Sequence, residues 1–239
     1  MLDVLNQGRF GTPEKPTLWS NHPSALTEAV PVALLCEDLK MTREETDRLG
    51  ASAVALTHGD PETFLAGAVL THGLTELLTQ PTLSAEGILR NTVEAIQQQF
   101  GRQYGQTTHI WELLQMAMTL AASGNVRQCD AMERLGCRSA AEVLAGALYA
   151  VLTCGGDFDA AMITAVNHSG RSAAVGAVTG AILGAKQGQG ALPDFYLDSL
   201  EPVEVLLELA DDITQGCPVG SNGFLFDDDW DRKYRSGGF

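Results

Sequence analysis

Helical periodicity governs almost the whole chain from Ser24 onward. Apolar residues recur there at intervals of three and four, as in residues 140–152, and no convincing strand-like alternation interrupts them. The sequence therefore predicts an all-α fold, a compact single-domain bundle of about nine or ten helices. We expect residues 24–215 to form this domain, residues 1–23 to be an N-terminal arm or loop, and residues 216–239 to be an acidic C-terminal tail.

Capping residues indicate where several of these helices begin. Ser24 is expected to cap the first long helix, which Pro31 would bend. Thr42–Glu45 has the spacing of a capping box, and the helix that follows is expected to end near Leu56. Asp60 precedes a proline at the favoured first helical position.

Later boundaries follow from the same signals. A Gly-Gly pair at 155–156 is expected to end one helix, and Asp157 or Asp159 to cap the next. A last helix is predicted over residues 202–214. Its apolar side chains are expected to face inward: Val205, Leu206, Leu209, Ala210 and Ile213.

Charge and cysteine content exclude several classes of protein. The net charge is −15 and no cluster of Lys and Arg is present, which disfavours nucleic acid and an anionic membrane surface as partners. The longest run of apolar and small residues, 173–185, is shorter than the roughly 20 residues of a membrane span. Five cysteines without a CxxC pair indicate small buried residues in a reducing compartment, and we predict a cytoplasmic protein: Cys36, Cys129, Cys137, Cys154 and Cys217.

The most informative segment is a loop, residues 167–172, that leads into a helix rich in glycine. Gly176, Gly180 and Gly184 recur at intervals of four, although glycine costs about 1 kcal/mol in a helix interior. One interpretation is that another helix backbone packs closely against this stripe. The other adds a ligand phosphate at the N-terminus of the helix, where free N–H groups attract anions.

These motifs, taken in order, resemble the signature region of the ADP-ribosylglycohydrolases of the dinitrogenase reductase-activating glycohydrolase type. In that family the pattern is Asn-x-Gly-Gly-Asp-Ser/Thr-Asp-Ser/Thr, followed by a Gly/Ala-rich helix. Residues 157–161, residues 165–170 and the glycine helix carry the resemblance here. Weaker similarities flank them: the Thr57-His58-x-x-Pro61 element, the Pro31 helix, Leu192-Pro193, Leu200-Glu201 and the region from Trp230 to Tyr234.

The metal-binding positions of the family are replaced. Family members hold Mg²⁺ or Mn²⁺ with two aspartates of the late motif, and this chain has Arg171 and Ala173 there, with Ala174 at the following hydroxyl position. The family's Gly-Asp-x-x-Gly and Thr-Asp-Asp-Thr motifs do not occur, so the chain resembles an N-terminally shortened member. Glu28 also replaces an arginine of the family's Asn-Gly-x-x-Met-Arg motif. We therefore expect no metal and no cofactor.

The resemblance implies a non-hydrolytic or impaired member that binds an ADP-ribose-type ligand; the catalytic residues are unknown. The residues expected to contact that ligand are Asn167, His168, Ser169, Gly170, Arg171, Ser172, Gly176, His58 and Asp60. His168 either faces the ligand or makes a structural hydrogen bond. His58 and Asp60 either face the ligand cleft or form a surface imidazole and a helix cap. His72 and His109 are expected at the surface or as satisfied core residues.

Two other hypotheses stay open. The first is an active hydrolase that releases ADP-ribose from a protein or a small molecule and recruits metal through carboxylates such as Asp60 or Asp157. The second is an interaction or structural protein. Missing N-terminal helices would expose an apolar face, which residues 1–23, a second copy or a partner chain would have to cover. The three carboxylates at 227–229 are expected to form a solvated tail and not an ion site.

Overall fold

The described part of the chain is entirely helical. The computed structural model describes residues 8, 10–198, 200–214 and 232, and these contain eleven α-helices, two 3-10 helices and no strand. The all-α prediction is confirmed. The expected number of helices was slightly low because two short helices, α7 (Gln128–Leu135) and α11 (Asp194–Leu197), have too few turns to show a clear periodicity.

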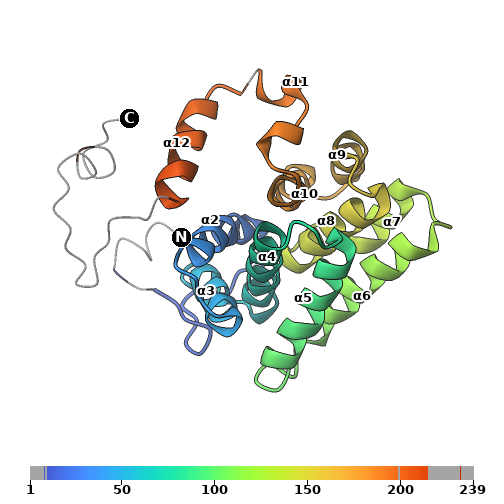
Figure 1. Ribbon diagram of the computed structural model, residues 1–239. Helices are drawn as coiled ribbons and strands as arrows, with labels where there is room; N and C mark the ends of the chain where they lie inside the picture. Colours follow the sequence, from blue (N-terminus) through green and yellow to red (C-terminus); the bar gives the residue numbers. More distant parts are fainter. Residues whose placement is uncertain (1–7, 9, 199, 215–231, 233–239) are drawn as a thin grey trace.

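The first half of the domain is organised around α4. The elements in order are η1 (Pro23–Ala25), α2 (Leu26–Asp38), α3 (Arg43–Ala55), α4 (Pro61–Thr79), α5 (Ala85–Phe100) and α6 (Thr108–Ser123). Helix α4 is buried over most of its length and packs against α2, α3 and α5 (Figure 1). Its apolar residues surround the helix, which is typical of a central helix.

A second central helix, α8, organises the rest. The remaining elements are α8 (Ala140–Cys154), α9 (Phe158–Val166), α10 (Ser172–Gln187), η2 (Gln189–Ala191) and α12 (Val203–Thr214). Helix α8 packs against α6, α9 and α10, and α10 also reaches α4. Helix α11 contacts α9 through the rings of Phe158 and Tyr196, whose centroids lie 5.1 Å apart.

Most predicted caps are confirmed. Thr42 forms a complete capping box, with its hydroxyl group accepting from the backbone of Glu45 and the carboxylate of Glu45 accepting in return. Asp157, and not Asp159, caps α9. The prediction for Ser24 is wrong because the chain first forms a 3-10 turn, which the His22 side chain caps.

Helix α12 contradicts the sequence-based expectation. Val205 and Leu206 were predicted to face inward but are 38% and 50% exposed, and no residue of α12 is buried. The helix packs on α2 at one side of the molecule (Figure 1). An amphipathic pattern indicates which face is apolar, whereas burial requires enough neighbours to cover that face.

The glycine stripe of α10 has a narrower role than expected. A Cβ at Gly176 would lie 3.1 Å from a methyl group of Val166 on α9, so this position is needed for close packing. At Gly180 and Gly184 a Cβ would meet nothing within 4 Å among the described residues. The expectation of a close helix contact along the whole stripe is therefore wrong at these two positions.

A buried hydrogen bond between two side chains joins α3 and α4. The Nδ1 atom of His72 lies 2.7 Å from the Oδ1 atom of Asp47, and both side chains are almost completely buried. Burial raises the pKa of Asp47, while the hydrogen bond from His72 works in the opposite direction. The expectation that His72 is a satisfied core residue is confirmed, and His109 is exposed as the surface alternative allowed.

The cysteine prediction is confirmed only in part. Cys36 and Cys137 are buried, Cys154 is half-buried and Cys129 is exposed, and all four are free thiols. Cys217 and residues 227–229 lie outside the described residues. Within the described residues, the helices are all too short or too polar to cross a lipid bilayer.

Candidate functional site

The predicted ligand loop, residues 167–171, lies against the turn that precedes α8. The Arg171 amide donates to the Cys137 carbonyl oxygen at 2.7 Å. A Cβ at Gly170 would lie 2.5 Å from that same oxygen and 2.7 Å from the Gly136 oxygen, so only glycine allows this approach. Cys137 itself has a φ of 54°, which lets its carbonyl group point at the loop. Burial raises the pKa of its thiol to about 12, which makes this cysteine a poor nucleophile.

Hydrogen bonds within the loop use most of its donors. The Nε2 atom of His168 lies 2.9 Å from the Ala165 carbonyl oxygen, and its Nδ1 atom accepts from the Gly170 amide at 3.0 Å. Asn167 donates to the Ile163 oxygen, and Ser172 to the His168 oxygen. His168 therefore has the structural role of the two that the sequence allowed, because both its ring nitrogens are engaged.

A carboxylate of α7 occupies the outer donors of the same loop. Glu133 accepts from the Ser169 amide and from the Ser169 hydroxyl group, both at 2.6 Å. These hydrogen bonds lower the pKa of Glu133. Arg138 reaches the same hydroxyl oxygen at 3.4 Å. The serine of the loop thus already holds an anion supplied by the chain itself.

Arg171 presents a positive charge at the start of α10. Its Nε atom donates to the Arg138 carbonyl oxygen at 3.1 Å, and its side chain is exposed. It occupies the N-cap position without making a side-chain cap there. Arg138 is also exposed, so two guanidinium groups flank the N-terminus of α10 on an otherwise acidic protein. Ala173, also exposed, offers no ligand atom from its side chain.

The buried His58 belongs to a different hydrogen-bond network, with Ser24, Glu28 and Thr57. The Thr57 hydroxyl group donates to Glu28 at 2.8 Å, so it must accept from the Nδ1–H of His58, which lies 2.8 Å away. The Nε2 atom of His58 lies 3.4 Å from the Ser24 hydroxyl group. Burial lowers the pKa of His58 and raises that of Glu28. A neutral imidazole fits this arrangement, and His58 is not the surface residue that one interpretation allowed.

The N-terminal arm packs against Gly59, the residue that follows His58. Gly59 donates to the Leu18 carbonyl oxygen at 2.7 Å, and a Cβ on Gly59 would collide with Pro16. Further along the chain, the Ala140 amide at the start of α8 donates to the Asn21 oxygen at 2.9 Å. The N-terminal arm therefore contacts both the start of α4 and the start of α8.

Asp60 acts as a helix cap. Its carboxylate accepts from the Thr63 amide at 3.1 Å and from the Thr63 hydroxyl group at 2.9 Å. Burial raises the pKa of Glu62, the second residue of α4, and a hydrogen bond from the Ile110 amide in the first turn of α6 acts in the opposite direction. Glu62 thereby supplies the cap that Thr107 does not make. Asp60 thus caps its own helix α4, and Glu62 links the starts of α4 and α6.

Three functional contacts were not predicted from the sequence: Glu28 with Thr57, Glu133 with Ser169, and Cys137 with the loop backbone. The partners in the first two are 29 and 36 residues apart. A local pattern cannot show such pairs. The available signal was the unexpected acidic residue at Glu28, where the resembling family has arginine.

The described residues contain no group of three or more His, Cys, Asp or Glu side chains placed to hold a metal ion. A sequence model of the ADP-ribosylglycohydrolase family matches residues 2–222. The chain belongs to the ADP-ribosylglycohydrolase family. The all-α fold and the signature loop before α10 agree with this membership. No curated protein matches the sequence.

Proposed function

We propose that this ADP-ribosylglycohydrolase family member is non-hydrolytic and binds an ADP-ribose-type ligand without a metal ion. The observation that carries the proposal is Arg171, a fixed cation at a position where the family motif has a metal-binding aspartate. Its guanidinium group is exposed at the N-terminus of α10 and is oriented by a hydrogen bond to the Arg138 carbonyl oxygen.

The side chains around the loop do not fit a divalent cation. Mg²⁺ requires oxygen ligands in near-octahedral geometry, and Arg171 and Ala173 supply none. The carboxylates of Asp60 and Asp157, the candidates to replace them, accept hydrogen bonds at the starts of α4 and α9. Glu133 is held by Ser169. These contacts support the proposal against an active, metal-dependent hydrolase.

Recognition of a diphosphate remains chemically reasonable at this place. A guanidinium group binds phosphate oxygens through parallel N–H donors, and a helix N-terminus adds a favourable dipole. Arg171 provides one such group at the start of α10, and Arg138 provides a second, which reaches the Ser169 hydroxyl group of the loop. Neither can lower the pKa of a water molecule as a bound metal does, so binding is not followed by attack on the glycosidic bond.

Isothermal titration with ADP-ribose, with and without Mg²⁺, tests both parts of the proposal. We expect binding of similar affinity in the two conditions. Arg171→Gln should weaken it about tenfold or more, since a charge-assisted hydrogen bond contributes about 1.5–3 kcal/mol. Arg102→Gln, at an exposed arginine in the loop between α5 and α6, is the matched control. Absence of heat in both conditions would refute ligand binding, and binding only with Mg²⁺ would refute the loss of the metal site.

A second candidate function, association with another chain, is favoured by the apolar residues that α11 and α12 leave exposed. Phe195, Val205, Leu206 and Leu207 all fall in this class. Burying such side chains against a second copy or a partner would be favourable. Light scattering on the purified protein tests self-association: a dimer would support it, and a monomer at high concentration would leave only a partner chain.

A further inference from the structure

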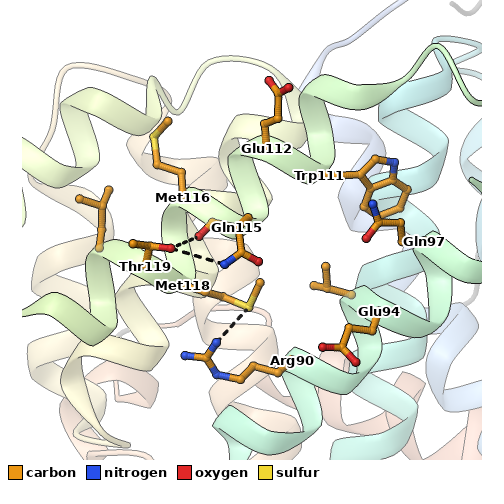
Figure 2. A pocket seen from close by; sticks show the side chains of 11 residues that line it. Arg90, Glu94, Gln97, Trp111, Glu112, Gln115, Met116, Met118 and Thr119 are labelled. Atoms are coloured by element: carbon orange, nitrogen blue, oxygen red, sulfur yellow. Dashed lines mark hydrogen bonds between the residues drawn. The ribbon is translucent and has the colours of Figure 1, made fainter.

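A groove between α5 and α6 is separate from the family site. Its volume is about 600 Å³, within the range of about 300–1,000 Å³ that ligand sites occupy. Figure 2 shows its two walls, with Arg90, Glu94 and Gln97 on α5, and Trp111 and Glu112 among those on α6. Neither the signature loop nor the His58 network contributes a residue to it.

The floor of the groove is apolar and adaptable. Val93 and Met118 are buried beneath it, and Trp111 is half-buried at its side. Met116, on the rim, is 42% exposed and adds apolar surface beside the floor. Methionine is flexible and polarisable, so a floor and rim of this kind can adapt to different apolar side chains.

The charges on the rim are acidic and not neutralised. Arg90 pairs with Glu86 one turn earlier on α5, at 3.0 Å, and its Nη1 atom lies 3.9 Å from the sulfur atom of Met118, so one paired cation lies among the acidic residues. Glu94 on α5 and Glu112 on α6 are exposed, and neither forms an ion pair among the described residues. Two unpaired carboxylates therefore stand on opposite walls of an apolar groove (Figure 2).

We propose that this groove docks a basic amphipathic helix of a partner protein. The apolar face of such a helix would cover Val93, Met118 and Trp111, and Lys or Arg side chains on its two flanks would meet Glu94 and Glu112. A second copy of this chain fits poorly. None of its described helices carries more than two Lys or Arg residues, so none of them offers the two basic flanks that this acidic rim requires.

The probe for this proposal is a labelled, amidated 15-residue peptide of Leu, Ala and Lys, with Leu spaced along one helical face and Lys on both flanks. Its binding to the full-length protein is measured by fluorescence anisotropy. A peptide of the same composition in scrambled order, which has no apolar face, should bind at least tenfold more weakly. Equal binding of the two peptides would overturn the proposal, because charge attraction alone would then explain it.

Charge reversal locates the site. The double variant Glu94→Lys with Glu112→Lys should weaken peptide binding about tenfold, since each lost rim pair contributes up to about 1 kcal/mol. The matched control is Glu201→Lys with Glu204→Lys, which changes the net charge equally at exposed positions near α12. An equal loss in both variants would overturn the proposal.

Met116→Gln separates apolar docking from charge. This exposed substitution should weaken binding without changing the thermal midpoint, and unchanged affinity would count against a helix seated on the floor. Light scattering tests the competing occupant. A dimer that the double variant at Glu94 and Glu112 dissociates would overturn the proposal in favour of self-association. The proposal does not depend on ADP-ribose binding, and no ADP-ribose is added in these measurements.

Discussion

The contact between the signature loop and the turn before α8 predicts opposite effects for two Gly→Ala substitutions in neighbouring segments. At Gly170 the new Cβ would lie 2.5 Å from the Cys137 carbonyl oxygen and 2.7 Å from that of Gly136. Both atoms belong to the backbone, so the loop must move away. Overpacking typically costs 1–3 kcal/mol, and loss of the hydrogen bond from the Arg171 amide to Cys137 costs about 1 kcal/mol.

We therefore expect Gly170→Ala to destabilise the protein by about 2–4 kcal/mol, which lowers the thermal midpoint by about 5–15 °C in a domain of this size. Gly180→Ala is the matched control. Its Cβ would meet nothing within 4 Å in the described structure, so removing a helical glycine should stabilise by about 0.5–1 kcal/mol. Circular dichroism melts of both variants test this. A midpoint for Gly170→Ala within about 2 °C of the unsubstituted protein would refute the close backbone contact.

Two further predictions concern buried and exposed carboxylates. Asp47→Ala leaves His72 buried without an acceptor and should lower the free energy of unfolding in urea by about 3 kcal/mol. Asp47→Asn keeps an acceptor and should lower it clearly less. Equal losses in the two variants would contradict this. For Glu133, the native pKa is lowered from 4.5 by the hydrogen bonds from Ser169, so its stabilising effect is present above pH 4.5 and is lost as the pH falls through the native pKa. The difference in thermal midpoint between the unsubstituted protein and Glu133→Gln should accordingly be seen at pH 7 and vanish at low pH, and a difference independent of pH would exclude this contact as its cause.

Local signals explain why much of the fold could be predicted. The capping box at Thr42 and the carboxylate caps at Asp60 and Asp157 depend on residues three positions apart, which the sequence displays directly. The prediction that the apolar residues of α12 are buried was wrong, because periodicity does not reveal how many neighbours a helix has. The short helix α7 was not predicted because it has too few turns to show a clear apolar periodicity.

The candidate site was predictable only as a segment. The family resemblance located the loop and the substitution at Arg171. It did not show that the N–H and O–H groups of the loop donate hydrogen bonds to other groups of the same chain. That depends on contacts such as Glu133 with Ser169, which arise from packing between α7 and the loop. Likewise, His58 could be assigned to a buried network only once Glu28 and the N-terminal arm were placed around it.

Release of ADP-ribose from a mono-ADP-ribosylated protein, measured with Mg²⁺ or Mn²⁺ present, tests the central claim most directly. The sequence resemblance implies that Arg171 and Ala173 replace two metal-binding aspartates, and the proposed loss of hydrolysis therefore predicts no release above the rate without protein, with either metal. An active member of the family assayed in parallel shows that the substrate is competent. Metal-dependent release by this chain, abolished by EDTA and restored by added Mg²⁺, would contradict the account.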